Sequence, residues 1–503
     1  MQLHKLGEII GVRLTPIIVP HAFDTQTLHN GHFKSVTVMN LTYPSKCLLT
    51  LSTASALLLT ACSTLMPSPL TQLPPLVFVH GNGDSGALWQ TTMWRFESNG
   101  WRPDLLHAID VPYPLARDAD PKEQVGRSST TEHMNYLKSE VEAVLKKTGA
   151  KQVVLIGNSR GGNAIRNYIC NGGGAQTVSH AVIGGGTSHG VQAVPGLNDA
   201  SEFSGAGPFL KQLNAPKNEK GDEVCGPTKW MTVRSDNNDK FAQPDGLWIG
   251  MKGRATLVGF DGPELKGANN VVIPRIDHRE TSFSQASFNA TYHFLTGQKP
   301  AHNIVEEKQV RLNGKVFGLG QDPSNASSGN FVNNLALKGA SLEVFEIDTA
   351  TGKRMGNAVH RKTINEEGTW GPFQGHSKAR YEFVVTASGY ATTHFYRSPF
   401  ARSSQTIHMR PERMADADKA AQAVVTLTRP RGYFDADRDT MIFDGKSELP
   451  GITKGTGAGN SNVRLRLPDT LQRSISAEFN GEKLIGLTWP ASQGHTTILE
   501  LTY

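Results

Sequence analysis

One serine, Ser159, has the sequence surroundings of a catalytic nucleophile. It lies between Gly157 and Gly161 in the stretch VVLIGNSRGG. Gly157 directly follows four apolar residues. The pattern G-x-S-x-G between a strand and a helix forms a sharp turn, in which the flanking glycines let strand and helix pass closely without Cβ clashes. We therefore predict that Ser159 is a nucleophile, with a small residue in an ordinary turn as the alternative.

A serine hydroxyl is a weak nucleophile at neutral pH and needs a base. His278 follows an apolar stretch in VVIPRIDHRETSF and precedes a predicted helix in QASFNATYHFLTG, which places it in the loop after the last strand. His189 lies too soon after the serine, and His293 falls within the predicted helix. His80 is expected to shape the loop that it opens. We predict that His278 is the base.

The base must in turn be oriented by an acid, which should lie between the serine and the histidine. The stretch WMTVRSDNNDKFAQPDG ends a predicted strand and offers Asp236, Asp239 and Asp245. Asp239 precedes a mixed apolar segment and is preferred, while Asp236, closer to the strand end, stays open as the alternative.

Two backbone N–H groups should stabilise the negative oxygen that forms when the serine attacks a carbonyl. One is the N–H of Arg160, the residue after the nucleophile. The other should come from the glycine-rich loop HGNGDSG, with Asn82 as the expected donor.

The predicted site residues must be positioned by a scaffold, and the sequence predicts one in which strands alternate with helices. Short apolar runs predict strands at Leu76–Val79, Val153–Ile156 and in the runs that start at Ala181, Lys229 and Asn270. Apolar residues at helical spacing predict a helix over 130–147, with Thr130 or Thr131 as its cap. This alternation predicts an α/β fold with a doubly wound, mostly parallel sheet over residues 76–302.

Beyond TGQKP (296–300) the segments become short, alternating and separated by turns, which predicts a β-rich sandwich or barrel. We divide it into a β domain at 303–414 and a second β unit at 415–503, separated by a polar helical patch, PERMADADKAAQAV. Six aromatic residues of the first unit form a core or, alternatively, an adhesive surface: Trp370, Phe373, Tyr381, Tyr390, Phe395 and Tyr396.

The N-terminal region has the features of an export signal. Residues 39–62 combine Lys46, an apolar run and LTAC, which resembles a bacterial lipobox ending at Cys62. This predicts lipidation of Cys62 and a lipoprotein of the outer membrane or cell surface; an ordinary cleaved signal, with secretion, or a buried helix is the alternative. Residues 1–38 are a possible mis-assigned extension, and 63–75 a tether.

Two further cysteines, Cys170 and Cys225, would remain in an oxidising compartment and could form one disulfide; otherwise they are separate thiols.

The net charge of +6 is small for 503 residues, and no basic run is interleaved with aromatics, so nucleic-acid binding is not expected. The stretch DADRD (435–439) lacks the glycine and glutamate of a calcium loop, so we predict no metal.

Residues 74–300 resemble bacterial lipases and esterases of the α/β-hydrolase superfamily in VFVHGNG, LIGNSRGG, GPFLKQLN, VRSDNNDKFAQP and IDHRETSF. With its β region the chain is similar to two-domain archaeal-type lipases, most visibly where YHFLTGQKPAHNIV leads into KVFGLG. The resemblance implies hydrolysis of a lipid or other ester through an acyl-enzyme, without a cofactor. Asn158 replaces a histidine of many lipases, and GGGTSHG (184–190) has no carboxylate, which favours the 236–239 loop.

Three other interpretations stay open. The same triad could serve a polyester depolymerase or an acyltransferase, and the chain could instead be mainly a surface-binding lipoprotein. The glycine-rich segment 190–214 could cover the acyl site as a lid or be an ordinary loop and helix.

Overall fold

The computed structural model describes residues 73–323, 330–468 and 472–503, and Leu70–Tyr503 form one compact unit. The predicted extension, the export signal with Cys62 and all but the last residues of the tether lie outside the described residues. Within the part of the chain that is described, no helix is long and apolar enough to cross a membrane.

The first part of this unit contains a six-stranded sheet, in which every pair of neighbouring strands is parallel. All five strands predicted for this part are present, several of them longer than predicted. In spatial order the strands are β2 (Leu106–Ala108), β1 (Leu76–Val79), β5 (Val153–Asn158), β6 (Val178–Gly184), β7 (Lys229–Ser235) and β8 (Asn269–Ile273).

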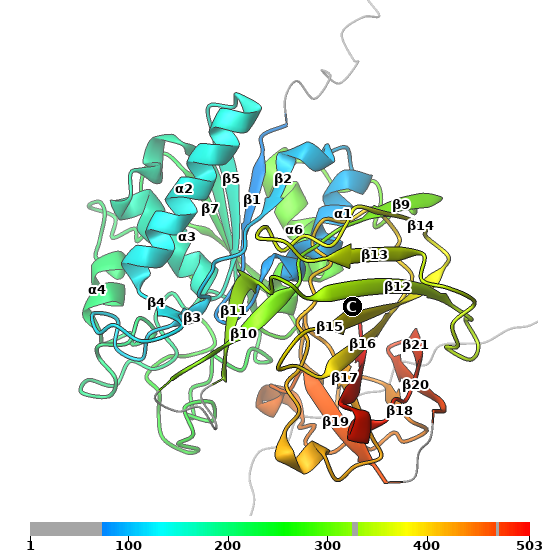
Figure 1. Cartoon of the computed structure of the whole chain (residues 1–503). Helices are drawn as coiled ribbons and strands as arrows, with labels where there is room; N and C mark the ends of the chain where they lie inside the picture. The colour runs from blue at the N-terminus through cyan, green and yellow to red at the C-terminus, as the bar shows by residue number, and fades with distance from the viewer. Residues whose placement is uncertain (1–72, 324–329, 469–471) are drawn as a thin grey trace, which may run out of the picture. The chain divides into compact units, whose positions relative to one another are not determined.

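Helices cover both faces of this sheet (Figure 1). Val77 and Val79 of β1 pack toward α2 (Thr130–Thr148) and α3 (Arg160–Asn171). Leu76 and Phe78 of the same strand pack toward the opposite pair, α1 (Gln90–Ser98) and α6 (Gln285–Thr296). Burial on both faces explains the continuous apolar runs of the strands. The predicted α/β-hydrolase fold is confirmed.

The residue that caps the start of helix α2 is Ser129, one residue before the first predicted cap, Thr130. Ser129 Oγ accepts a hydrogen bond from the N–H of Glu132, and the Glu132 carboxylate accepts one from the N–H of Ser129. This reciprocal pair satisfies two N–H groups at the helix start, so the prediction of Thr130 or Thr131 as the cap is wrong.

The C-terminal region is strand-rich, with mainly antiparallel pairing. Its largest sheet has the order β13 (His360–Thr363), β12 (Ser341–Ile347), β15 (Arg380–Thr386), β16 (Thr392–Arg397), β22 (His495–Glu500), β17 (Ala423–Thr428) and β19 (Asn462–Leu467). Strand β22, from the end of the chain, pairs in parallel with both β16 and β17. The predicted boundary near residue 415 therefore does not separate two sheets.

Smaller sheets pack against the two faces of this large sheet, as in a sandwich. One core includes residues of β9 (Gln309–Leu312) and β14 (Phe373–His376), and the other includes residues of β18 (Met441–Phe443), β20 (Ser474–Phe479) and β21 (Glu482–Leu487). In a separate two-stranded sheet, β10 (Phe317–Gln321) pairs with β11 (Asn330–Ala336) in antiparallel fashion. Of the six aromatic residues considered above, five are buried and belong to the two cores, whereas Tyr390 is half-buried.

The predicted polar helical patch between residues 411 and 424 is wrong. Within it the chain forms only a short turn of 3-10 helix at Asp416–Asp418 before β17 begins at Ala423. The buried Asp418 carboxylate instead binds Arg464, at 2.7 Å, and Arg466, at 2.9 Å. These ion pairs to the neighbouring strand β19 hold the segment in a form that local helix propensity does not predict.

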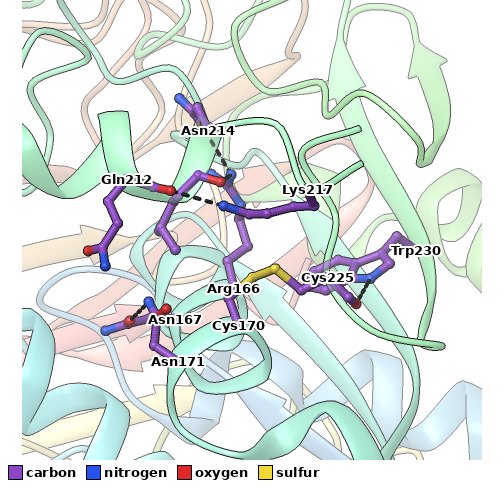
Figure 2. Close-up of a disulfide and its surroundings, with 10 residues drawn as sticks. Arg166, Asn167, Cys170, Asn171, Gln212, Asn214, Lys217, Cys225 and Trp230 are labelled. Atoms are coloured by element: carbon purple, nitrogen blue, oxygen red, sulfur yellow. Dashed lines mark hydrogen bonds between the residues drawn. A yellow bond between two sulfur atoms is a disulfide. The ribbon is translucent and has the colours of Figure 1, made fainter. Parts of the chain in front are cut away.

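A disulfide joins Cys170, near the end of α3, to Cys225, in the segment before β7 (Figure 2). The two cysteines are 55 residues apart in sequence, so the bond closes a large loop that contains β6 and α4 (Pro208–Asn214). Closing a loop of this size reduces the conformational freedom of the unfolded chain.

Replacing both cysteines by serine should lower the free energy of unfolding by about 2–4 kcal/mol. Urea unfolding followed by near-ultraviolet circular dichroism measures this difference. A reducing agent should move the unfolding curve of the original protein toward that of Cys170→Ser/Cys225→Ser and leave the variant's curve unchanged. Coincident curves for the two proteins would show that the disulfide contributes no stability.

Candidate active site

Ser159 occupies the sharp turn between β5 and α3, with backbone angles φ 52° and ψ −120°. A positive φ is unfavourable for a residue with a side chain, so the surrounding contacts must hold this conformation. The N–H of Ser159 donates to the carbonyl of Gly184 at 3.0 Å. The Asn158 amide donates to the carbonyls of Gly184 and His278, each at 3.1 Å, and so ties the turn to the loop of the predicted base.

Three glycines allow the turn to pack this closely. A Cβ added to Gly161 would lie 2.5 Å from the carbonyl oxygen of Val79. A Cβ at Gly162 would lie 2.4 Å from Ile183, and one at Gly157 would lie 2.6 Å from Ile165. The residues that formed the sequence pattern are therefore required by the packing of β5 and α3 against their neighbours.

His278 and Asp239 form a buried hydrogen-bonded pair. His278 Nδ1 lies 2.8 Å from Asp239 Oδ2 and 2.9 Å from Oδ1, and Oδ1 also accepts the N–H of Phe241 at 2.8 Å. His278 Nε2 is buried and has no hydrogen-bond partner among the described residues. Ser159 and His278 line the same cavity, of about 240 Å³. With Nδ1 bound to the acid, Nε2 is the ring nitrogen that remains for proton transfer.

The other candidate acids and bases make different contacts. Asp236 accepts the N–H groups of Asn237, at 2.7 Å, and Arg275, at 3.0 Å, and so stabilises its own loop. The exposed Asp245 accepts the N–H of Leu247. His189 bonds to Gly262 and Glu223, while His293 lies within α6.

The first loop reaches the serine at Gly81, where an added Cβ would lie 3.2 Å from Ser159 Cβ. His80, immediately before it, accepts the N–H of Val111 through Nε2 at 3.1 Å and bonds to the Gly81 carbonyl through Nδ1 at 2.9 Å. Burial lowers the pKa of His80, which suits a neutral ring that shapes the loop. Asn82 lines the cavity, and its side chain accepts the N–H of Ala116 at 2.7 Å.

Arg160 is the first residue of α3, so its backbone N–H has no acceptor within the helix. Its side chain is fully buried, with Nε donating to Glu202 at 2.9 Å and Nη2 to the carbonyl of Ser128 at 2.6 Å. This ion pair ties the segment 190–214 to the turn that carries Ser159. Two residues of that segment, Val191 and Phe203, line the cavity.

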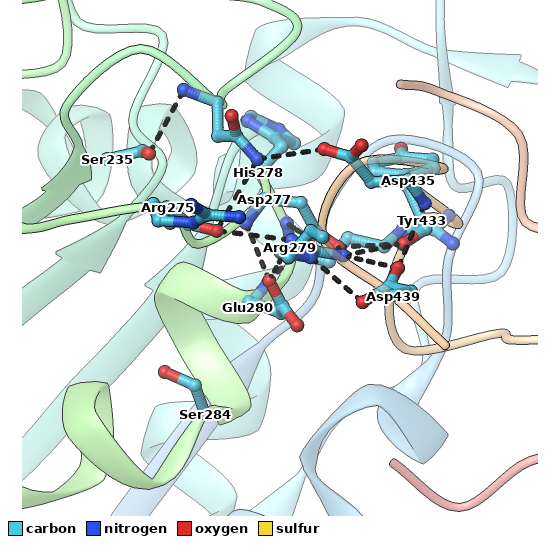
Figure 3. A network of polar contacts seen from close by, with 12 residues as sticks. Ser235, Arg275, Asp277, His278, Arg279, Glu280, Ser284, Tyr433, Asp435 and Asp439 are labelled. Atoms are coloured by element: carbon cyan, nitrogen blue, oxygen red, sulfur yellow. Dashed lines mark hydrogen bonds and ion pairs between the residues drawn. The ribbon is translucent and has the colours of Figure 1, made fainter. Parts of the chain in front are cut away.

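The C-terminal region also contributes to this cavity, through Tyr433. Arg429 and Arg438 of the same region bind Asp277 and Glu280. These two carboxylates flank His278 in the sequence, and Figure 3 shows them together with Tyr433 of the C-terminal region. Arg429 lies 2.9 Å from Asp277 and 2.6 Å from Glu280, and Arg438 lies 2.6 Å from Glu280. Sequence reasoning missed these residues because their partners are about 150 positions away and no local pattern links them.

The buried charges of Asp277 and Arg279, on either side of His278, are each stabilised by groups of opposite charge. Burial alone would raise the pKa of Asp277, but Arg429 and Arg438 outweigh it and hold that pKa below its usual value. Burial opposes the charge of Arg279, but the attraction of Asp84 raises the pKa of Arg279 above its usual value. Asp277 and Arg279 therefore stay charged on either side of His278.

Two segments of the chain match protein-family models. Residues 73–226, which include Ser159, match the class 2 lipases, and residues 308–414 match the lipase C-terminal domain. These matches confirm the resemblance to lipases and esterases of the α/β-hydrolase superfamily that carry a C-terminal domain. They support an ester hydrolase of the lipase or esterase type.

The solved structures that match this chain include lipases from a fungus and a bacterium. Aspergillus fumigatus lipase B is 12% identical, with a TM-score of 0.33. The match covers 46% of this chain and 54% of the fungal lipase, so this chain spans about half the length of that protein. Bacillus licheniformis lipase BlEst2 in mature form is 20% identical, with a TM-score of 0.31 over 46% of this chain and 93% of its own. Its propeptide form is 14% identical, with a TM-score of 0.32 over 82% and 92%. No curated protein matches this chain in sequence.

Gly161→Ala should destabilise the protein by roughly 1–3 kcal/mol, because the new Cβ forces the backbone of β1 and the first loop to move. Thermal or urea unfolding checks this, with Gly356→Ala as the matched control. A Cβ added to Gly356 would meet open space, and the φ of Gly356 is not positive, so its replacement should leave stability nearly unchanged. Equal stability of the two variants would contradict the packing argument.

Proposed function

We propose that this protein is a serine carboxylic-ester hydrolase that works through an acyl-enzyme. The observation that carries the proposal is the buried Asp239–His278 pair, whose histidine lines the same cavity as Ser159 in its strained turn. A nucleophile, a base and an acid that orients the base are the groups that ester hydrolysis by a serine requires.

In the proposed reaction, Ser159 Oγ attacks the ester carbonyl carbon while His278 Nε2 accepts the hydroxyl proton. Asp239 holds the ring through Nδ1 and stabilises the charge that the ring acquires. The backbone N–H groups of Arg160 and Asn82 stabilise the negative oxygen of the tetrahedral intermediate. Its collapse breaks the bond to the alcohol, which leaves with the proton from His278. Water then attacks the acyl group by the same steps, releases the acid and restores Ser159.

Ser159→Ala should abolish hydrolysis of a short p-nitrophenyl ester, because no other group in the proposed mechanism forms the acyl bond. The release of p-nitrophenol measures the rate. Circular dichroism should show that the variant is folded. Turnover by the folded variant at the original rate would refute the assignment of Ser159.

Asp239→Asn should lower kcat by roughly 10³–10⁴-fold, because an amide no longer stabilises the charged ring of His278. Asp236→Asn is the matched control, since it makes the same chemical change in the same loop at a residue that bonds to backbone N–H groups. Its kcat should change far less. The reverse order of the two effects would identify Asp236 as the acid.

We also propose that the chain is exported and anchored through a lipid on Cys62. The sequence LTAC at the end of an apolar run supports this proposal, as does the Cys170–Cys225 disulfide, because disulfides persist in oxidising compartments. The protein made in a bacterial host should partition into a detergent phase, whereas Cys62→Ala should partition into the aqueous phase. Mass spectrometry of the N-terminal peptide detects the lipid. An unmodified Cys62 in the exported protein would contradict the anchor.

A further inference from the structure

We propose that the C-terminal region completes the acyl pocket through Tyr433, and that the pocket so formed selects esters with short acyl groups. This inference rests on the proposed ester hydrolysis and adds the substrate class. It makes Tyr433 a specificity-determining residue that lies outside the α/β sheet and its helices.

The cavity beside Ser159 is small. During the reaction the acyl group is bound to Ser159, so it must occupy the cavity that Ser159 lines. That cavity measures about 240 Å³, which lies below the range of roughly 300–1,000 Å³ that is usual for ligand pockets. A cavity of this size favours a short acyl group over a long one.

Apolar and aromatic side chains form part of the wall of this cavity. Val191, Phe203 and Phe241 of the first part of the chain line the cavity, and Tyr433 joins them from the C-terminal region. Carbon-rich side chains of this kind favour an apolar acyl group over a charged one. The charged pair in the wall, Asp84 and Arg279, is 3.3 Å apart and so compensates its own charges.

The backbone of Tyr433 is fixed on both sides. Its N–H donates to Asp277 at 2.7 Å, and its carbonyl accepts from Arg429 at 2.6 Å and Arg438 at 2.9 Å. Because Asp277 immediately precedes His278, the same carboxylate holds the pocket wall and the loop of the proposed base. The wall therefore has a fixed position relative to that base.

The ring of Tyr433 is held as well. The Lys240 ammonium lies 3.8 Å from the ring centroid, and the Arg279 guanidinium lies 5.1 Å from it. Cations over an aromatic ring attract its negative face. Only 6% of Tyr433 is exposed. A ring with these contacts cannot move aside for a long acyl chain without losing them.

The test uses the full chain and compares p-nitrophenyl acetate, butyrate, octanoate and palmitate. The original protein should show the highest kcat/KM with acetate or butyrate. Tyr433→Ala should raise the ratio of kcat/KM for octanoate to that for acetate by about tenfold or more, within the range of discrimination that pocket size provides. Tyr433→Phe, which keeps the ring, should retain the original profile.

Tyr503→Ala is the matched control, because it makes the same change at a side chain that is 41% exposed and does not line the cavity. Its profile should not change. If Tyr433→Ala does not fold, Tyr433→Leu keeps an apolar side chain there and should shift the ratio in the same direction. Circular dichroism identifies the folded variants.

The outcomes separate this inference from the proposed function. No hydrolysis of any ester by the folded original protein would refute the proposed function itself. Hydrolysis with a preference for palmitate, or an unchanged ratio in a folded Tyr433→Ala or Tyr433→Leu variant, would overturn the short-acyl pocket and leave the serine hydrolase standing.

Discussion

The burial of the Asp277 carboxylate beside His278 is the constraint on which the site depends. A buried charge that has no partner costs roughly 3–5 kcal/mol. Asp277 avoids this cost through Arg429, at 2.9 Å, and through the N–H of Tyr433, at 2.7 Å. Both groups belong to the C-terminal region, so contacts from that region stabilise the loop that carries His278.

This constraint joins two parts of the chain into one site. The parallel sheet places Ser159 at the end of β5 and Asp239 and His278 in the loops after β7 and β8. The C-terminal region fixes the loop after β8 and adds Tyr433 to the cavity wall. Other contacts connect the same two parts, among them Trp94 of α1, whose indole N–H donates to the carbonyl of Ser403 and whose ring packs in the core with β9 and β15.

The strain at Ser159 has a comparable explanation. Its positive φ is tolerated because Gly157, Gly161 and Gly162 allow the neighbouring backbone and side chains to approach. The Arg160–Glu202 ion pair and the Asn158 amide then tie the turn to two other loops. The serine is therefore held by contacts on several sides, which is the arrangement expected of a strained residue in an active site.

The sequence by itself determined the local parts of this protein. Five of the six strands of the parallel sheet, the turn at Ser159 and the helix after it follow from apolar runs and glycine positions, which act over a few residues. The tertiary structure decided what depends on distant partners: the bond between Asp239 and His278, the turn at Asp416–Asp418 in place of a helix, the sheet that crosses residue 415, and the entry of Tyr433 into the cavity. Ion pairs and strand pairs of this kind join residues far apart in sequence, and no local pattern specifies which partners meet.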